Sequence, residues 1–340
     1  DIAFGLQGEL RQALQLLDHP RLDLLGRLGL DPNSVSGRIR RGDVAFAFPL
    51  VDDLTFERTQ VQADAALSGV RVADFALGQE VSDGTLELSV NKAGMTVTGP
   101  ARLGGVQVSE MTWQERFEAG AEEVTRIDAK VPALTAAARA NLGIETRPYL
   151  NGPVGLDVTY RSFRGGRSSV RLTGDLTPAR VALEAADWVK PPGNPGALAA
   201  TLLLEDGAPF GLEDVQASAT AQDDSRLRLD GGTASLSDGG ARLERVRLAE
   251  LRLGRNDLSD LALTRTQTGW TAEIGGGVLD LAPYLSDAVA GARSEDESRG
   301  PPPSLELRPS KLQQVYFAQD RYVENVTLSA RRGADGWWRE

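Results

Sequence analysis

The chain has 340 residues, of which 41% are hydrophobic and 25% are charged, and its formal net charge is −11. Plentiful apolar residues exclude a disordered chain. The net negative charge, with no stripe of basic residues along the chain, argues against a nucleic-acid-binding protein. The absence of cysteine excludes disulfides, thiolate nucleophiles and cysteine-ligated zinc. No apolar run reaches the roughly 18 residues that a membrane-spanning helix needs.

The first 34 residues predict two short helical segments. Residues 9–17 predict a helix, because Leu10, Leu14 and Leu17 fall on one face and His19-Pro20 ends it. Residues 22–30 form a second apolar turn. Strand patterns begin near residue 35, where apolar and polar residues start to alternate.

The clearest strand signal is a hairpin over residues 86–99. Leu86, Leu88 and Val90 alternate with polar residues, residues 91–94 form a turn, and the alternation returns at Met95 and Val97. Val106 and Val108 continue the series. We expect one face of these strands to be apolar and the other to be wet.

Residues 131–143 interrupt the alternation and predict a helix near 132–142. Leu134, Ala138 and Leu142 have helical spacing, Pro132 suits a first turn and Gly143 suits the C-terminal cap. Strands resume afterwards, with alternating apolar positions at Val154, Leu156, Val158, Tyr160, Val170 and Leu172.

A Pro/Gly-rich connector at residues 191–195 predicts a boundary between a first segment, 1–190, and a second, 196–340. Alternation in the second segment includes Leu202, Leu204, Leu227, Leu229, Val246 and Leu248. The apolar positions change phase before Leu251, which predicts a β-bulge or bend near Glu250. A helix is expected near 280–290, followed by a charged, proline-rich loop over 294–303.

The number of strands decides the architecture. Roughly eighteen to twenty strands about 4.8 Å apart would extend on the order of 90 Å side by side, and open sheets rarely exceed about ten strands without curling or splitting. The apolar face must also be covered. We therefore predict a mainly β protein: an elongated, twisted antiparallel sheet curled into an open groove, with a few short helices. The chain is expected to be a fragment of a longer one.

Residues for catalysis or metal binding are few. His19 is the only histidine, so a histidine metal site is excluded and no catalytic triad is predicted. No phosphate-binding loop or dinucleotide fingerprint occurs. Acidic pairs such as Asp52-Asp53 and Asp223-Asp224 are typical of solvated turns. We predict no enzymatic activity, no metal and no cofactor. Trp188 is interpreted as an aromatic side chain packed over the 190–193 loop.

Several strings of residues, taken in order, resemble one protein family. They are Leu28-Gly29-Leu30-Asp31-Pro32, Gly99-Pro100-Ala101-Arg102-Leu103, Leu150-Asn151-Gly152-Pro153, Gly174-Asp175-Leu176-Thr177-Pro178, Trp188-Val189-Lys190-Pro191-Pro192-Gly193 and Gly276-Gly277-Val278-Leu279-Asp280-Leu281. Together they resemble the central or C-terminal region of YhdP-type proteins of the AsmA-like superfamily, in a Gram-negative, alphaproteobacterial version. The resemblance covers nearly the whole chain.

This resemblance implies a bridge-type lipid carrier. It implies an inner-membrane anchor outside this segment and a periplasmic β groove that reaches toward a partner at the outer membrane. Phospholipid acyl chains would slide along the apolar floor while head groups stay in water. The family has no catalytic residues to carry over, and it implies no nucleic-acid partner.

The candidate groove residues are the apolar members of the alternating strands. They are Leu86, Leu88, Val90, Val97, Val106, Val108, Val154, Leu156, Val158, Tyr160, Val170, Leu172, Leu202, Leu204, Leu227, Leu229, Val246 and Leu248. Two alternatives stay open. The chain could be a structural or interaction β-sandwich or stalk module whose core is filled by its own side chains. A β-rich glycan-active enzyme is disfavoured by the 6% aromatic content and the single histidine.

Overall fold

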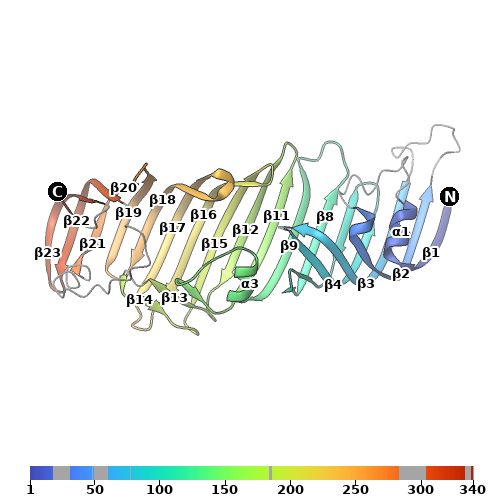
Figure 1. Ribbon diagram of the computed structural model, residues 1–340, viewed down its shortest axis with the longest axis horizontal. Helices are drawn as coiled ribbons and strands as arrows, with labels where there is room; N and C mark the ends of the chain where they lie inside the picture. The colour runs from blue at the N-terminus through green and yellow to red at the C-terminus, as the bar shows by residue number, and fades with distance from the viewer. Residues whose placement is uncertain are drawn as a thin grey trace. The chain divides into compact units, whose positions relative to one another are not determined.

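The computed structural model describes residues 1–17, 31–47, 49, 60–76, 78–183, 186–282, 304–333 and 338–339. The predicted fold class is confirmed: the protein is mainly β, with a large, twisted, mostly antiparallel sheet and a few short helices (Figure 1). Within the described ranges, 21 strands belong to this sheet and three strands form a second, small sheet.

The chain divides into two compact units. Unit 1 contains residues 1–146 and 153–170, and unit 2 contains residues 147–152 and 171–340. The boundary at 170/171 lies within strand β12 (Arg167–Asp175) and differs from the connector expected at 191–195. That connector is bound inside unit 2, because Gly193 N donates to Thr177 O and Asn194 Nδ2 donates to Thr220 O.

Unit 1 carries most of its residues in strands. Its strands are β1 (Ile2–Glu9), β2 (Val35–Ala47), β3 (Gln60–Ala76), β4 (Gln79–Val90), β5 (Gly94–Thr98), β6 (Ala101–Leu103), β7 (Val106–Val108), β8 (Glu110–Arg116), β9 (Glu123–Leu134) and β11 (Val154–Phe163). Its helices are α1 (Leu10–Leu17), the 3-10 turn η1 (Pro32–Ser34) and α3 (Ala136–Asn141).

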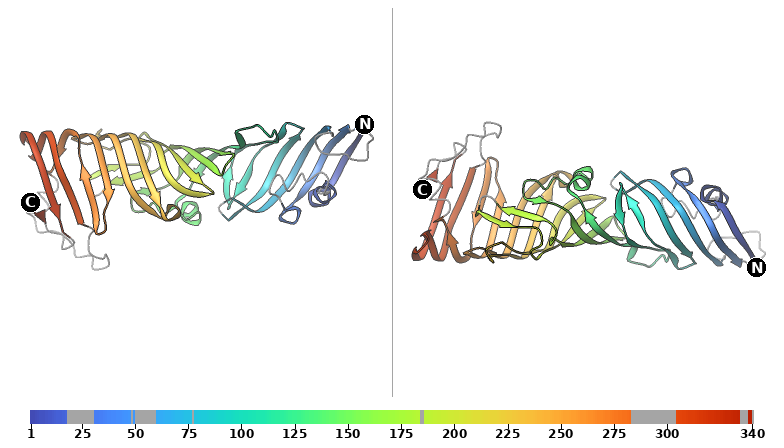
Figure 2. Two further views of the ribbon diagram at one scale, coloured as in Figure 1. Left: turned by 90° about the horizontal axis from the view of Figure 1, so that it is seen from above. Right: turned by 90° about the horizontal axis from the view of Figure 1, so that it is seen from below.

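The strands of unit 1 pair antiparallel, mostly in chain order. β1 pairs with β2, β2 with β3 and β3 with β4. β4 then pairs with both β5 and β6, and the sheet continues from β5 through β8 and β9 to β11 (Figure 2). Gly99 makes the double pairing of β4 possible: its φ is 133°, and a Cβ there would lie 2.2 Å from Thr85 O.

The N-terminal helix is confirmed, and it follows a strand that the alternation did not predict. Ile2, Phe4 and Leu6 of β1 alternate with Ala3, Gly5 and Gln7, and Gly8 ends this short apolar pattern. β1 nevertheless forms because its backbone pairs with β2 over most of its length, from Ile2 opposite Phe46 to Glu9 opposite Arg38.

The helix expected near 132–142 is shorter than predicted. Pro132 lies within β9, and the helix α3 starts after Thr135, whose Oγ1 accepts a hydrogen bond from Ala138 N. A proline fits a strand at a position that donates no ladder hydrogen bond, so its presence did not mark the first helical turn. Gly143 follows α3 with φ 75°, as expected of a residue after a C-cap.

Unit 2 also consists mainly of strands. They are β10 (Leu150–Asn151), β13 (Arg180–Leu183), β14 (Trp188–Lys190), β15 (Gly196–Glu205), β16 (Ala208–Thr220), β17 (Arg226–Ser237), β18 (Arg242–Leu253), β19 (Asn256–Arg265), β20 (Gly269–Glu273), β21 (Gly276–Asp280), β22 (Ser304–Ala318), β23 (Arg321–Arg332) and β24 (Trp338–Arg339). The 3-10 turn η4 (Asp238–Gly240) joins β17 to β18.

β15 to β19 form an antiparallel meander. β19 pairs with β20 and with β21, both of which pair in parallel with β22, and β22 forms a hairpin with β23. The small sheet of β10, β13 and β14 lies in front of the large sheet in Figure 1.

The β-bulge expected near Glu250 is absent, because no register shift interrupts the pairing of β18 with β17 or β19 at this point. The change of apolar phase is instead shared with the neighbouring strands. Leu248 lies opposite Leu261, and Leu251 lies opposite Leu258, so β18 and β19 change phase together. The two strands beside β18 each have a residue with left-handed backbone near this point, and these residues allow the change of phase. They are Gly231 of β17 (φ 59°) and Asp260 of β19 (φ 51°). The apolar residues therefore stay on one face along both strands.

Three expected features fall largely on residues outside the described ranges. They are the apolar turn over 22–30, the helix near 280–290, of which only 280–282 are described, and the loop over 294–303.

Candidate functional site

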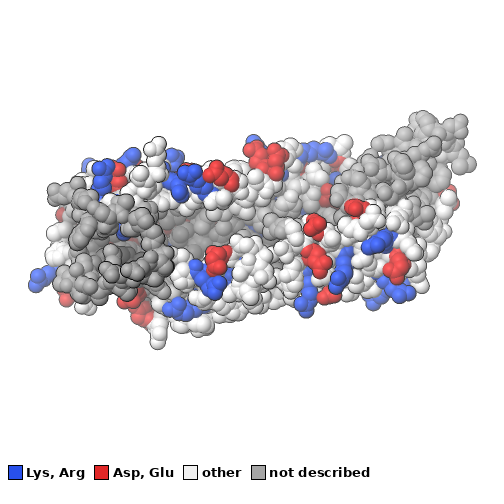
Figure 3. Space-filling view, in the orientation of Figure 1, with Lys and Arg blue, Asp and Glu red and all other residues white. Residues whose placement is uncertain are grey.

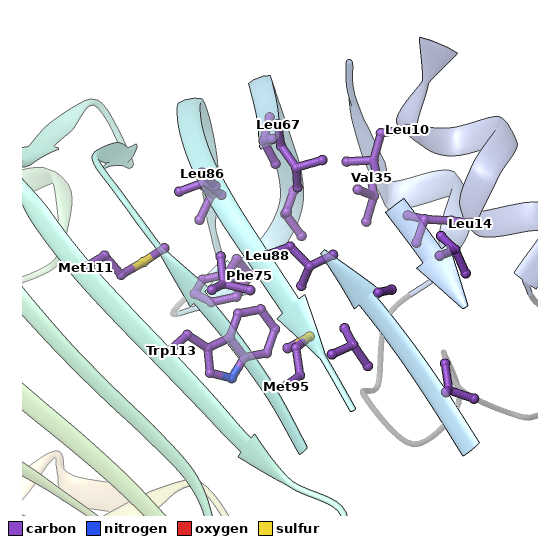
Figure 4. Close-up of a pocket in the computed structure, with 18 of the residues that line it drawn as sticks. Leu10, Leu14, Val35, Leu67, Phe75, Leu86, Leu88, Met95, Met111 and Trp113 are labelled. Atoms are coloured by element: carbon purple, nitrogen blue, oxygen red, sulfur yellow. The ribbon is translucent and has the colours of Figure 1, made fainter. Parts of the chain in front are cut away.

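Unit 1 contains an apolar hollow on one face of its sheet. The space, including the part that opens to solvent, is about 1170 Å³. All of its lining residues are apolar (Figure 4): Leu10, Leu14, Val35, Val44, Phe46, Val61, Ala63, Leu67, Val70, Val72, Phe75, Val81, Leu86, Leu88, Val90, Met95, Val97, Met111, Trp113 and Phe117.

Strand pairing brings these side chains to one face. Directly opposite residues of an antiparallel pair share a face, and Leu88 lies opposite Val97, which lies opposite Trp113. A continuous row therefore crosses eight strands: Leu6, Gly42, Ala65, Leu88, Val97, Trp113, Ile127 and Tyr160. We call it the unit 1 row.

The other face of the same strands is polar. Glu87 lies opposite Thr98, and Asp64 lies opposite Ser89. Ion pairs such as Arg126–Asp128, with Nε and Oδ2 2.7 Å apart, lie on this face. Arg126, together with a hydrogen bond from Thr159 Oγ1, holds the pKa of Asp128 below its usual range. These charges lie on the face away from the hollow.

Helix α1 covers one end of the hollow. Leu10 and Ala13 are buried against β2 and β3, and Leu14 is partly exposed and lines the hollow (Figure 4). Arg11 Nε donates to Val35 O at 3.3 Å and attaches the helix to the start of β2. The helix therefore bounds the hollow without filling it.

Helix α3 fills the apolar face elsewhere in unit 1. Ala138 and Leu142 pack on a buried cluster of Val106, Val108, Val131 and Leu134. Arg139 is 3% exposed and donates from Nη1 to Leu134 O at 2.9 Å, and burial lowers the pKa of its guanidinium. This part of the face is an ordinary protein core.

The candidate groove residues of the first segment are thus in different environments. Leu86, Leu88, Val90 and Val97 line the hollow. Four others belong to the core under α3 or border it: Val106, Val108, Val154 and Leu156. The remaining four are partly exposed positions on β11 and β12: Val158, Tyr160, Val170 and Leu172.

Unit 2 has an apolar row of its own. It runs across β15 to β23 through Leu202, Leu212, Ala234, Val246, Leu263, Ala272, Leu307 and Ala330. We call it the unit 2 row. All of its members except Ala272 are partly exposed. The six candidate residues of the second segment are also partly exposed, and two of them, Leu202 and Val246, belong to the row: Leu202, Leu204, Leu227, Leu229, Val246 and Leu248.

The charged side chains of unit 2 lie outside this apolar surface. Arg228, opposite Arg252, and Thr233, opposite Arg247, are on the polar face. In Figure 3, charged side chains of unit 2 lie along the upper and lower margins, and the visible atoms between these margins are uncharged.

The small sheet covers part of the apolar face of unit 2. Trp188 is 3% exposed, so it is a packed aromatic as interpreted, but it packs on Ala219 and Ala221 and not over the 190–193 loop. Lys190 is fully buried, and its Nζ donates to the carbonyl oxygens of Thr177, Ala179 and Pro191 at 3.3, 2.8 and 3.1 Å. Burial lowers the pKa of Lys190. These contacts anchor the loop that follows β14.

One carboxylate lies on the apolar face of unit 1. Glu115 is opposite Met95 on β5 and opposite Thr125 on β9. Trp113 Nε1 donates to Glu115 Oε2 at 3.2 Å. Burial raises the pKa of Glu115, and hydrogen bonds from Thr125 and Trp113 act in the opposite direction.

The sequence reasoning missed several lining residues. Phe75, Met111, Trp113 and Phe117 line the hollow but were not candidates, although Met111, Trp113 and Phe117 alternate along β8 and just beyond it. This spacing of two was a usable signal. Leu10 and Leu14 were assigned to a helix face, and only the fold shows that this face borders the hollow.

Within the described ranges, no group of three or more His, Cys, Asp or Glu side chains could hold a metal ion. The described helices include none that is long and apolar enough to cross a membrane. Comparison of the chain with models of known families, with curated proteins and with solved structures gave no match.

Proposed function

We propose that this chain is a segment of a non-enzymatic lipid carrier. It binds the acyl chains of phospholipids on the apolar face of its sheet, and their head groups stay in water. The carrier works in the periplasm of a Gram-negative bacterium and moves phospholipid between the inner and the outer membrane. An anchor outside this segment holds it to the inner membrane, and a partner receives lipid at the outer membrane.

The observation that carries this proposal is the hollow of unit 1. It is lined by apolar side chains alone, and its floor is formed by strands whose other face is polar. Transfer of each CH₂ from water to such a surface contributes about 0.8 kcal/mol. An alkyl chain of a dozen or more carbons therefore gains enough free energy to leave water.

The apolar rows support movement along the sheet. The unit 1 row and the unit 2 row carry uncharged, mostly apolar residues from strand to strand. Neighbouring strands are about 4.8 Å apart. A chain that shifts by one strand therefore stays on apolar surface and meets no charge in either row. The resemblance to the AsmA-like superfamily points to the same function.

The alternative is a structural or interaction module. The cores under α3 and under the small sheet favour it locally, because there the protein's own side chains fill the apolar face. A module of this kind would need no lipid anywhere along the chain.

Mass spectrometry of gently purified protein separates the two. The chain is expressed with export to the periplasm, purified without detergent, and its bound lipids are extracted and quantified. We expect phospholipid at close to stoichiometric or higher amounts. Phospholipid at the background level of an unrelated periplasmic protein purified in parallel would contradict lipid carriage and favour the structural module.

A further inference from the structure

The polar pair at the hollow of unit 1 is Trp113 and Glu115. Both belong to β8, and since side chains of a strand alternate between faces, Glu115 shares the apolar face with Trp113 and Phe117. Met95, directly opposite Glu115 on β5, also lines the hollow. Three lining residues therefore surround this carboxylate.

The carboxylate is held in place. Oε2 accepts a hydrogen bond from Trp113 Nε1 at 3.2 Å, and the Thr125 side chain supplies another. The Trp113 ring is itself fixed by an edge-to-face contact with Phe75, with ring centroids 5.5 Å apart. A positioned polar group at the margin of an apolar pocket is the usual means of orienting a ligand.

Burying a carboxylate beside apolar side chains costs free energy unless the charge is compensated. The two hydrogen bonds compensate only in part, because an ionised carboxylate has about four acceptor sites. Glu115 is partly exposed, so water also solvates its charge and a ligand head group can reach the carboxylate.

We propose that Glu115 binds the head group of an amphiphile whose alkyl chain occupies the hollow, and that it selects a primary ammonium head over an anionic one. The ammonium donates a charge-assisted hydrogen bond to the carboxylate, and such bonds are among the stronger hydrogen bonds in proteins. The same carboxylate repels an anionic head. This inference rests on the proposed function, because the alkyl chain must enter the hollow.

The test compares three ligands with the same chain: dodecylamine, dodecanoate and methyl dodecanoate. Their affinities are measured at neutral pH and below their micelle concentrations, by competition with a fluorescent apolar probe. Methyl dodecanoate has neither a charge nor a donor, so it reports binding of the alkyl chain alone. The 340-residue chain is used as wild type, as Glu115→Gln and as Glu87→Gln. Glu87 is exposed on the polar face of β4 and is the matched control for loss of one charge.

We expect the wild type to bind dodecylamine at least about tenfold more tightly than dodecanoate, the ratio that one charged hydrogen bond supplies. Glu115→Gln brings this ratio to within about threefold and leaves the affinity for methyl dodecanoate unchanged. Glu87→Gln keeps the wild-type ratio.

Equal wild-type affinities for dodecylamine and dodecanoate, a result that needs no variant, would overturn the selection by Glu115. An unchanged ratio in Glu115→Gln would overturn it as well. In both cases binding of methyl dodecanoate leaves the proposed function standing. If none of the three ligands binds, the proposed function fails and the inference fails with it.

Discussion

Leu88 of β4 lies directly opposite Val97 of β5, and both side chains face the hollow of unit 1. On the reverse side of the same hairpin, Glu87 lies opposite Thr98. One hairpin thus has an apolar face and a polar face. The same division continues through the unit 1 row, and it determines what substitutions at neighbouring positions will do.

Filling the hollow should block lipid binding. Ala63 of β3 lines the hollow, whereas the next residue, Asp64, is exposed on the polar face. Ala63→Phe places a ring in the space that an alkyl chain would occupy, and we expect the affinity for an acyl probe to fall by about tenfold or more. Asp64→Phe adds the same ring on the other face and should bind like the wild type. Equal affinities in the two variants would show that the hollow is not the binding site.

A charge on the apolar face of unit 2 should stop lipid transfer. Leu229 lies opposite Ala217 and Leu251 on this face, and Thr233 of the same strand lies on the polar face opposite Arg247. Leu229→Glu puts a carboxylate where alkyl chains would pass, which is unfavourable by several kcal/mol without a partner. In a fluorescence assay of transfer between vesicles, we expect this variant to be inactive and Thr233→Glu to be active. Full transfer by Leu229→Glu would exclude unit 2 from the lipid path.

Truncations should distinguish the filled core from the hollow. Leu134 is buried under α3, so Leu134→Ala leaves a cavity and should lower the free energy of unfolding by about 2–5 kcal/mol. Leu88 is partly exposed and borders space that is already open, so Leu88→Ala should cost only about 1 kcal/mol for the lost contact with apolar surface. Urea titration of lipid-free protein measures both. Similar losses for the two variants would mean that the hollow is packed in solution.

The partly exposed carboxylate of Glu115 should have a signature in the pH dependence of stability. Burial raises the pKa of Glu115, so the folded chain binds this proton more tightly than the unfolded chain does. The contribution of Glu115 to stability is therefore lowest at neutral pH and increases as the pH falls through the folded-state pKa. On acidification from neutral pH, the wild type should gain stability relative to Glu115→Gln in paired urea titrations. A relative loss by the wild type would mean that the carboxylate is stabilised in its charged form.

Sequence reasoning reached the strands and their apolar faces because alternation is a local property. The hairpin of β4 and β5 and the helix α1 follow from the spacing of residues such as Leu86, Val97 and Leu10. β1 was missed although Ile2, Phe4 and Leu6 alternate, because this pattern is only three residues long and ends at Gly8; pairing with β2 decides its conformation.

The division of the apolar face into hollow and filled core could not be predicted. Val97 and Val108 have the same strand pattern, yet Val97 lines the hollow and Val108 belongs to the core under α3. The difference depends on where α3 and the small sheet of unit 2 pack, which is a tertiary property. The polar pair of Trp113 and Glu115 had a local signal, since Glu115 occupies an apolar position of an alternating strand.

Photo-cross-linking tests the vacant apolar face most directly. The protein is loaded with a phospholipid that carries a diazirine in the middle of one acyl chain, irradiated, and mapped at residue resolution by mass spectrometry. We predict cross-links at residues that face the hollow, such as Leu88, Trp113 and Phe117, with few at their polar-face neighbours Glu87 and Gln114. Cross-links spread equally over both faces, or absent from the hollow, would contradict the account.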